Sequence, residues 1–262
     1  MSRPLAIVGA TAIVGEELLD DAVVVAEDGR LRAVGARPEV AVPAGAETVD
    51  GSALLLAAGL IELQINGGFG HDFSADPATI WAVGERLVEH GVTAFLPTIV
   101  SSPPAVIEHA RAVLAAGPPA GYRGAMPLGL HLEGPFLDAG HAGAHELAML
   151  RPPGTMSVAD WAPANGVRMV TLAPELEGAL ALVAELAGRG VVVSAGHSGA
   201  TFEQGELAIA AGVRYATHLL NAMPPLDRRA PGLAAALLAD ERVVVGMIPD
   251  GIHVHPGLLR LV

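Results

Sequence analysis

Hydrophobic and polar residues follow two different patterns along the chain, and the change occurs near Gly59. Before this point, two apolar stretches flank the pair Asp28-Gly29. An Asp-Gly pair between two such stretches is typical of a β-hairpin turn. We therefore predict a small, sandwich-like but incomplete β domain over residues 1–55 and a second domain over residues 56–262.

Beyond Gly59 the apolar residues occur in short continuous runs, each followed by a loop and a segment with helix-capping residues. Runs of this kind are expected for strands that are buried on both faces of a parallel sheet. Asp76-Pro77 and Ser102-Pro103 are typical starts of the intervening helices. Seven strands are predicted in this way, at Leu60–Ile65, Ala94–Ile99, Leu128–Leu132, Met169–Leu172, Val191–Ala195, Tyr215–Leu219 and Val243–Ile248.

Strands that alternate with helices predict an α/β fold, here a TIM-like (β/α) barrel. Seven of the usual eight strands are present, and residues 56–262 are fewer than the roughly 250 residues of a typical complete barrel. A barrel that lacks one strand has two unpaired edges. We therefore expect the second domain to be a barrel without its eighth strand.

The composition indicates a folded chain with a large core, since 52% of the 262 residues are hydrophobic and 16% are charged. A net charge of −13 argues against nucleic acid as a partner. No uncharged apolar stretch reaches the roughly 18 residues of a membrane span, and no segment indicates secretion. We therefore expect a cytoplasmic protein without membrane contact. Because cysteine is absent, any metal ion must be bound by nitrogen and oxygen ligands.

Three potential metal ligands follow or end apolar runs, in the order Glu133, His197 and His218. One carboxylate and two imidazoles can hold a hydrolytic metal ion and leave a position open for water. Each residue alone is better explained as an ordinary turn or strand-end residue. In a TIM barrel, however, the carboxyl ends of the strands share one rim, where active sites lie. Their common placement therefore predicts a metal-dependent hydrolase.

Several longer motifs extend this prediction. They are Gly59 to Gly70, His131 to Phe136, Gly143 to His145, Gly196 to Ser198, Thr217 to Pro224 and Asp250 to Pro256. These motifs are similar, in the same order, to those of the N-acetylglucosamine-6-phosphate deacetylase family, whose members are metal-dependent barrels of the amidohydrolase superfamily. The resemblance extends over essentially the whole chain and implies a barrel of the metal-dependent hydrolase type.

The resemblance implies one divalent metal ion held by Glu133, His197 and His218. Zinc is the first choice, and iron and manganese accept the same ligands. Many members of the superfamily carry His-x-His on the first strand and bind two metal ions. This chain has Gln64 and Asn66 there, and the resemblance implies that these amides contact the metal through water.

The resemblance also implies a substrate site for an amino-sugar phosphate. Arg229 is the expected phosphate anchor, because its planar guanidinium group suits phosphate geometry. His253 is the expected donor to the sugar or to the developing oxyanion. The full set of implied substrate contacts is Ala144, His145, Asn221, Ala222, Arg229, Asp250, Gly251, Ile252 and His253.

The implied reaction is hydrolysis of the acetamide of N-acetylglucosamine 6-phosphate to glucosamine 6-phosphate and acetate by a metal-activated water. A small molecule is then the partner, and the resemblance suggests a homodimer. In the family the general base is an aspartate at the end of strand eight, and the 262 residues contain no matching aspartate. We therefore expect a sequence truncated at its C-terminus, with little turnover by the isolated chain. Two alternatives remain, a remnant that only binds metal and sugar phosphate, and an amidohydrolase for another N-acetylated sugar phosphate or a cyclic amide.

Overall fold

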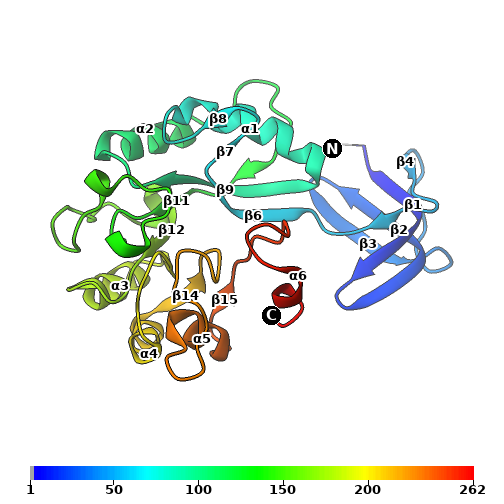
Figure 1. Ribbon diagram of the computed structural model, residues 1–262. Helices are drawn as coiled ribbons and strands as arrows, with labels where there is room; N and C mark the ends of the chain where they lie inside the picture. The colour runs from blue at the N-terminus through cyan, green and yellow to red at the C-terminus, as the bar shows by residue number, and fades with distance from the viewer. Residues whose placement is uncertain (1–2) are drawn as a thin grey trace. The chain divides into compact units, whose positions relative to one another are not determined.

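The computed structural model describes residues 3–262, which form two compact units separated between Gly59 and Leu60. The first unit is a five-stranded sheet with the order β3-β2-β1-β4, in which β5 also pairs with β1 (Figure 1). One face of this sheet buries Ala6, Val8, Val23 and Val25 as a small core. The strands are β1 (Leu5–Val14), β2 (Glu17–Glu27), β3 (Arg30–Ala36), β4 (Glu47–Asp50) and β5 (Leu55–Leu56).

The predicted hairpin joins β2 to β3. Glu27 pairs with Arg30 across the turn, and the strands are antiparallel. Asp28 and Gly29 have φ angles of 49° and 72°, and two successive positive φ angles are typical of a type I′ turn, which matches the twist of the flanking strands. The hairpin is confirmed, while the second sheet of a sandwich stays a prediction.

The second unit is built on a curled sheet in which every described pairing is parallel (Figure 1). Its order is β6-β9-β11-β12-β13-β14-β15, and β10 also pairs with β9. All seven predicted strand segments lie in this sheet. The strands are β6 (Leu60–Ile65), β9 (Val92–Val100), β10 (Met126–Pro127), β11 (Leu130–Glu133), β12 (Val167–Leu172), β13 (Val192–Ala195), β14 (Val213–Ala216) and β15 (Val244–Val245).

Three of the predicted strands differ most from the structure in extent, and one of them, predicted as Tyr215–Leu219, is β14, which begins at Val213 and ends at Ala216. The segment predicted as Leu128–Leu132 is interrupted at Gly129, whose φ of 127° is incompatible with regular strand geometry. The segment predicted as Val243–Ile248 is reduced to β15, which within residues 3–262 pairs only with β14. The α/β class is confirmed, and the number of strands in a complete barrel stays a prediction.

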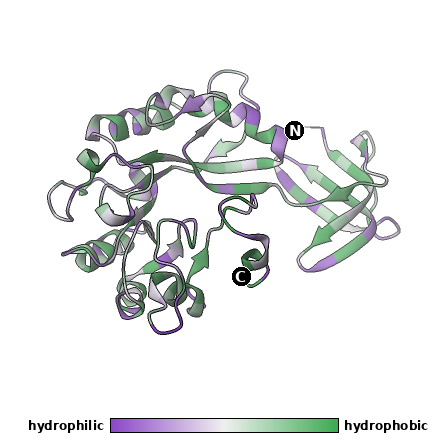
Figure 2. Ribbon diagram, viewed as in Figure 1, coloured by the Kyte–Doolittle hydropathy of each residue, from purple (hydrophilic) through white to green (hydrophobic). Residues whose placement is uncertain are grey.

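Helices α1 to α5 lie on the outer side of the curled sheet (Figure 1). Figure 2 shows hydrophobic residues along the strands and in the adjacent helices, with polar residues interspersed among them. A small two-stranded ribbon is formed by β7 (Gly67–Gly68) and β8 (His71–Asp72). The helices are α1 (Ile80–Leu87), α2 (Pro104–Ala115), α3 (Ala179–Gly188), α4 (Phe202–Ala211), α5 (Gly232–Ala239) and α6 (Pro256–Leu259), with 3-10 turns η1 (Pro77–Thr79), η2 (Val88–His90), η3 (Ala139–His141), η4 (Leu147–Met149) and η5 (Pro163–Asn165).

Capping and burial explain why these helices form where they do. Asp76 caps η1 by accepting a hydrogen bond from the Ala78 N–H at 3.1 Å, and Gly91 ends η2 with a φ of 77°. Large side chains such as Phe95 and Leu132 are fully buried in one core. Burial of such a side chain contributes about 1.5–3 kcal/mol relative to exposure. In the described part of the chain, none of the helices has the length and apolar character needed to cross a bilayer.

Candidate metal centre

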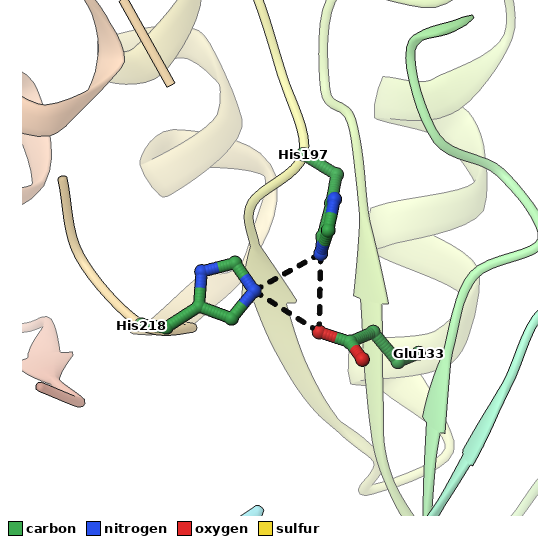
Figure 3. A group of neighbouring side chains, drawn as sticks. All are labelled: Glu133, His197 and His218. Atoms are coloured by element: carbon green, nitrogen blue, oxygen red, sulfur yellow. Dashed lines mark hydrogen bonds and ion pairs between the residues drawn. The ribbon is translucent and has the colours of Figure 1, made fainter. Parts of the chain in front are cut away.

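Three side chains predicted as metal ligands meet at the carboxyl edge of the curled sheet (Figure 3). Glu133 is the last residue of β11, while His197 and His218 lie just beyond β13 and β14. Glu133 Oε1 lies 3.2 Å from His197 Nε2 and 3.1 Å from His218 Nε2, and the two Nε2 atoms are 3.0 Å apart. The structure therefore brings together residues that are separated by up to 85 positions in the chain.

Both histidines have unusual backbone conformations. The φ angles of His197 and His218 are 50° and 30°, in the left-handed region that favours glycine. A conformation of this kind costs on the order of 1–3 kcal/mol and persists only where the surroundings enforce it. Because such positions are concentrated at functional sites, the strain supports a functional interpretation of the cluster.

Hydrogen bonds define the proton position on His197. The carbonyl oxygen of His141 can only accept, so the Nδ1–H of His197 donates to it at 2.9 Å. In the neutral imidazole the lone pair then lies on Nε2, which faces Glu133. His218 Nδ1, in contrast, is buried and has no hydrogen-bond partner among residues 3–262. His197 is thus already in the form required of a metal ligand.

The carboxylate of Glu133 is nearly inaccessible to solvent, with 3% of the residue exposed. Burial raises the pKa of Glu133, but the imidazole groups of His145, His197 and His218 outweigh it and hold the pKa well below its usual value. The group is therefore ionised at neutral pH. An ionised carboxylate beside two imidazole nitrogens is a suitable set of ligands for a divalent cation.

The amides of Gln64 and Asn66 lie on Glu133. Gln64 Nε2 donates to Glu133 Oε1 at 2.5 Å, and Asn66 Nδ2 donates to Oε2 at 3.5 Å. The hydroxyl of Thr217 donates to Gln64 Oε1, which directs the amide nitrogen toward the carboxylate. Both amides thus orient Glu133, and their contact with a metal through water stays a prediction.

The spacing of the three ligand atoms fits a tetrahedral metal ion. Zinc–nitrogen bonds of about 2.0–2.1 Å place neighbouring tetrahedral ligand atoms about 3.3 Å apart. The three separations of 3.0 to 3.2 Å are close to this value. Zinc, iron and manganese all accept such ligands, so the residues fit a divalent ion without distinguishing among these metals.

A cavity of about 620 Å³ opens onto the three ligand residues. Of the predicted substrate contacts, Ala144, His145 and His253 line it. A cavity of this size is typical of small-molecule sites. Its remaining lining consists of Glu62, Gln64, Asn66, Asp72, Val100, Glu133, His197, Tyr215, His218, Gly246, Met247, Ile248 and Pro249.

His145 is held in one orientation by Ser101, which follows β9. The backbone N–H of Ser101 donates to His145 Nδ1 at 3.2 Å, and the Ser101 hydroxyl oxygen lies 2.9 Å from the same nitrogen. The proton of the neutral ring is therefore on Nε2, which lies 3.6 Å from Glu133 Oε2. His145 thus presents an N–H group at the edge of the candidate metal centre.

The predicted phosphate contacts are not among the residues that line this cavity. Within the segment 221–230, which we call the substrate loop, residues 225–230 are exposed. The Asn221 amide donates to the His218 and Leu219 carbonyls at 3.2 and 3.4 Å, and the Arg229 N–H donates to Asp227 Oδ1 at 2.8 Å. The Ala222 carbonyl accepts a hydrogen bond from the N–H of the residue after His197. The structure therefore does not bring Arg229 to the ligand cluster.

The last predicted contacts form a tight turn around Asp250. Its Oδ1 accepts hydrogen bonds from the Ile252 and His253 N–H groups, at 2.8 and 2.9 Å, and Oδ2 lies 2.7 Å from His253 Nδ1. Backbone hydrogen bonds from His253 and Ile252, together with the His253 ring, lower the pKa of Asp250 to about 2. Gly251 has a φ of 74° in this turn, and Ile252 is 87% exposed. Asp250 therefore orients His253, the member of this group that lines the cavity.

A further histidine lies within the sheet, two residues before Glu133. The Nδ1–H of His131 donates to the Leu63 carbonyl at 3.2 Å, and Nε2 lies 2.7 Å from the Thr171 hydroxyl, which donates to it. Burial lowers the pKa of His131 to about 4. The ring is therefore neutral under ordinary conditions and fixed in one tautomer.

Sequence reasoning did not identify Ser101 and Thr217 as parts of the site, nor Glu175, which binds the segment after His197. Their position gave a usable signal, because Ser101 and Glu175 follow predicted strands and Thr217 directly precedes His218. This is the edge of a parallel sheet where functional side chains are expected.

Known proteins with similar sequences were found. The chain is 44% identical over 230 residues to N-acetylglucosamine-6-phosphate deacetylase from Danio rerio, a match that covers 81% of the chain and 56% of that protein. It is 32% identical over 268 residues to the protein of the same name from Bacillus subtilis (strain 168), covering 100% of the chain and 67% of that protein. The chain thus spans little more than half the length of the first relative. No family model matches the chain.

A solved structure is similar over nearly the whole chain. It is a variant of N-acetyl-D-glucosamine-6-phosphate deacetylase from Mycobacterium smegmatis, in complex with N-acetyl-D-glucosamine-6-phosphate. The TM-score is 0.83 with 37% sequence identity, and the match covers 99% of this chain and 67% of that chain. At this identity the likeness extends beyond the fold to the sequence.

Proposed function

The chain belongs to the N-acetylglucosamine-6-phosphate deacetylase family, and from this premise we propose that it binds one divalent metal ion and serves hydrolysis of an amino-sugar phosphate. The reaction is conversion of N-acetylglucosamine 6-phosphate to glucosamine 6-phosphate and acetate. The observation that carries the proposal is the convergence of Glu133, His197 and His218 at the floor of the cavity.

The chemistry follows from the groups around this cluster. A bound divalent ion lowers the pKa of a coordinated water and makes hydroxide available near neutral pH. Glu133 supplies the negative charge, and His197 supplies a lone pair fixed by the carbonyl of His141. His145 Nε2–H is a donor toward the substrate carbonyl, where negative charge develops during attack.

We place the sugar phosphate between His253 and the substrate loop. The Asp250 carboxylate orients the His253 ring at the cavity wall, which supports a role for His253 in binding the sugar. Arg229 is the proposed phosphate anchor, assisted by Asn221 and Ala222. Because Arg229 is exposed and is not among the residues that line the cavity, this proposal requires the substrate loop to move toward the ligand.

Finer features are proposed on the family relationship. Zinc is the proposed metal, because its tetrahedral geometry suits the three ligand atoms and an open position. The curled sheet is proposed to supply seven strands of a (β/α) barrel with eight strands, beside a small β domain. A homodimer and a cytoplasmic location are proposed on the family relationship alone.

The proposed function is tested by binding before turnover. Metal-free protein titrated with Zn²⁺ in a calorimeter is expected to take up one equivalent. The zinc-loaded protein is then expected to bind N-acetylglucosamine 6-phosphate more tightly than N-acetylglucosamine. Uptake of two metal equivalents would contradict the single-ion site, and equal affinity for both sugars would contradict the phosphate specificity.

A further inference from the structure

Glu175 lies in the loop after β12 and is outside the group of residues that line the metal-side cavity. Its carboxylate is half-buried and binds the segment that directly follows His197. The Ser198 hydroxyl donates to Glu175 Oε2 at 2.6 Å, and the Gly199 N–H donates to Oε1 at 2.6 Å. Hydrogen bonds to an ionised carboxylate are short and strong, so this contact fixes the segment firmly.

Ser198 connects this carboxylate to two other parts of the site. Its side chain is fully buried, and its oxygen accepts a hydrogen bond from the Ala200 N–H at 3.1 Å. Its own N–H donates to the Ala222 carbonyl at 3.1 Å, at the start of the substrate loop. The position of Ser198 is therefore defined from three directions, and Glu175 is the one charged group among them.

The other side of His197 is held by the loop after β11. The Asp138 N–H donates to the His197 carbonyl at 3.0 Å, and the His197 ring donates to the His141 carbonyl at 2.9 Å. These two bonds fix the carbonyl and the ring. They do not fix the direction of the chain after His197, which depends on the contacts of residues 198 and 199. These contacts must maintain the left-handed φ of 50° at His197.

We propose that Glu175 is a positioning residue for His197: by holding Ser198 and Gly199, it keeps the strained backbone of His197 in the conformation that directs Nε2 at Glu133. The inference rests on the proposed metal-binding function. A residue that only anchored its own loop would stabilise the fold without changing the coordination of a metal ion. A positioning residue changes metal affinity and ligand geometry.

The test measures Co²⁺ binding to the metal-free full chain by visible absorption, because band intensity reports the coordination geometry. E175A is expected to bind Co²⁺ about 10- to 100-fold more weakly, with weaker bands, as is usual when a group that orients a metal ligand is removed. E175Q is expected to recover most of the affinity, because its amide can accept from the Gly199 N–H and donate to the Ser198 oxygen. E177A is the matched control, since Glu177 is exposed in the same loop, and its binding should equal that of the wild type.

Three results would overturn the proposal. One is equal Co²⁺ affinity for E175A and E177A. Another is a result in which E175A binds Co²⁺ more weakly but with unchanged bands, E175Q does not recover the affinity, and metal-free E175A unfolds at a lower temperature. This combination would identify a structural role for Glu175. If E175A does not fold, S198A removes one of the two hydrogen bonds, and unaltered Co²⁺ binding by S198A would then be the overturning result. Failure of the proposed function is a separate outcome, in which the wild type itself binds no Co²⁺.

Discussion

The candidate metal centre and the substrate loop differ in what holds them in place. Glu133 ends a strand that pairs with neighbours on both sides, and its carboxylate receives hydrogen bonds from several elements. The substrate loop is held by local contacts, such as the Asp227 carboxylate accepting from the Arg229 and Ala230 N–H groups. A centre built on strand ends is rigid before a ligand arrives, whereas an exposed loop can move toward one.

This difference predicts separable effects of substitution. Changes at the metal centre should alter metal affinity and the stability of the sheet edge. Changes in the substrate loop should alter affinity for the sugar phosphate and leave the metal centre intact. Four substitutions test this separation, from the largest expected effect to the smallest.

Replacement of Glu133 by glutamine should have the largest effect. E133Q keeps the shape of the side chain but removes the charge and presents an amide group to the Gln64 donor. Because loss of an orienting group alone costs about 10- to 100-fold, loss of a ligand should weaken Zn²⁺ binding by more than about 100-fold in calorimetry. E146Q, at an exposed glutamate of the neighbouring loop, is the control. Comparable Zn²⁺ affinity in the two variants would remove Glu133 from the metal centre.

The three ligand residues could be predicted from the sequence because each follows an apolar run and parallel strands end at one edge. The strand positions were recognisable for the same reason. The interruption at Gly129, which has a φ of 127°, was not, since Arg168 and Gly166 lie where a side chain at this position would be and both are distant in the sequence. Contacts over such distances leave no local pattern.

The residues that orient the metal ligands could not be predicted from the sequence either. Thr217 and Gln64 are 153 positions apart, and Glu175 reaches Ser198 across 23 positions. The hydrophobic pattern does not predict which way these side chains point. Arg229 is the opposite case, because a motif nominates it for phosphate while the structure leaves it exposed and outside the group of residues that line the cavity.

Because His131 is buried, we expect the free energy of unfolding to decrease as the pH falls. The pKa of His131 is lowered by burial to about 4, so between pH 6.5 and 4 the unfolded chain binds a proton that the folded chain excludes. The stabilisation is fully present above pH 6.5 and is lost as the pH falls toward 4. A shift of this size corresponds to about 3 kcal/mol in the free energy of unfolding.

Denaturant unfolding of the metal-free protein between pH 7 and pH 4 measures this decrease in the free energy of unfolding. In H131N the pH dependence above pH 4.5 should largely disappear, while H109N, at an exposed histidine of α2, should retain it. If the free energy of unfolding of H131N depends on pH as steeply as that of the wild type, His131 is not the group that causes the pH dependence.

Replacement of Arg229 tests the substrate loop alone. R229A should weaken binding of N-acetylglucosamine 6-phosphate by roughly 10-fold or more, since a hydrogen bond to a charged group contributes about 1.5–3 kcal/mol. Zn²⁺ affinity and the unfolding temperature should not change, because Arg229 is exposed. R228A is the neighbouring control. A larger loss in R228A than in R229A would transfer the phosphate contact to Arg228.

The smallest effect is expected at Thr217, whose hydroxyl acts on the metal centre through Gln64. T217V removes the donor to Gln64 Oε1, so the amide is free to turn its oxygen toward Glu133 and lose the 2.5 Å hydrogen bond. We expect Zn²⁺ affinity to fall by less than about 10-fold, in line with about 1 kcal/mol for one hydrogen bond. T217S keeps the hydroxyl and should bind Zn²⁺ like the wild type. A loss in T217S with no loss in T217V would instead identify the methyl group, which lies close to Gly196, as the feature that matters.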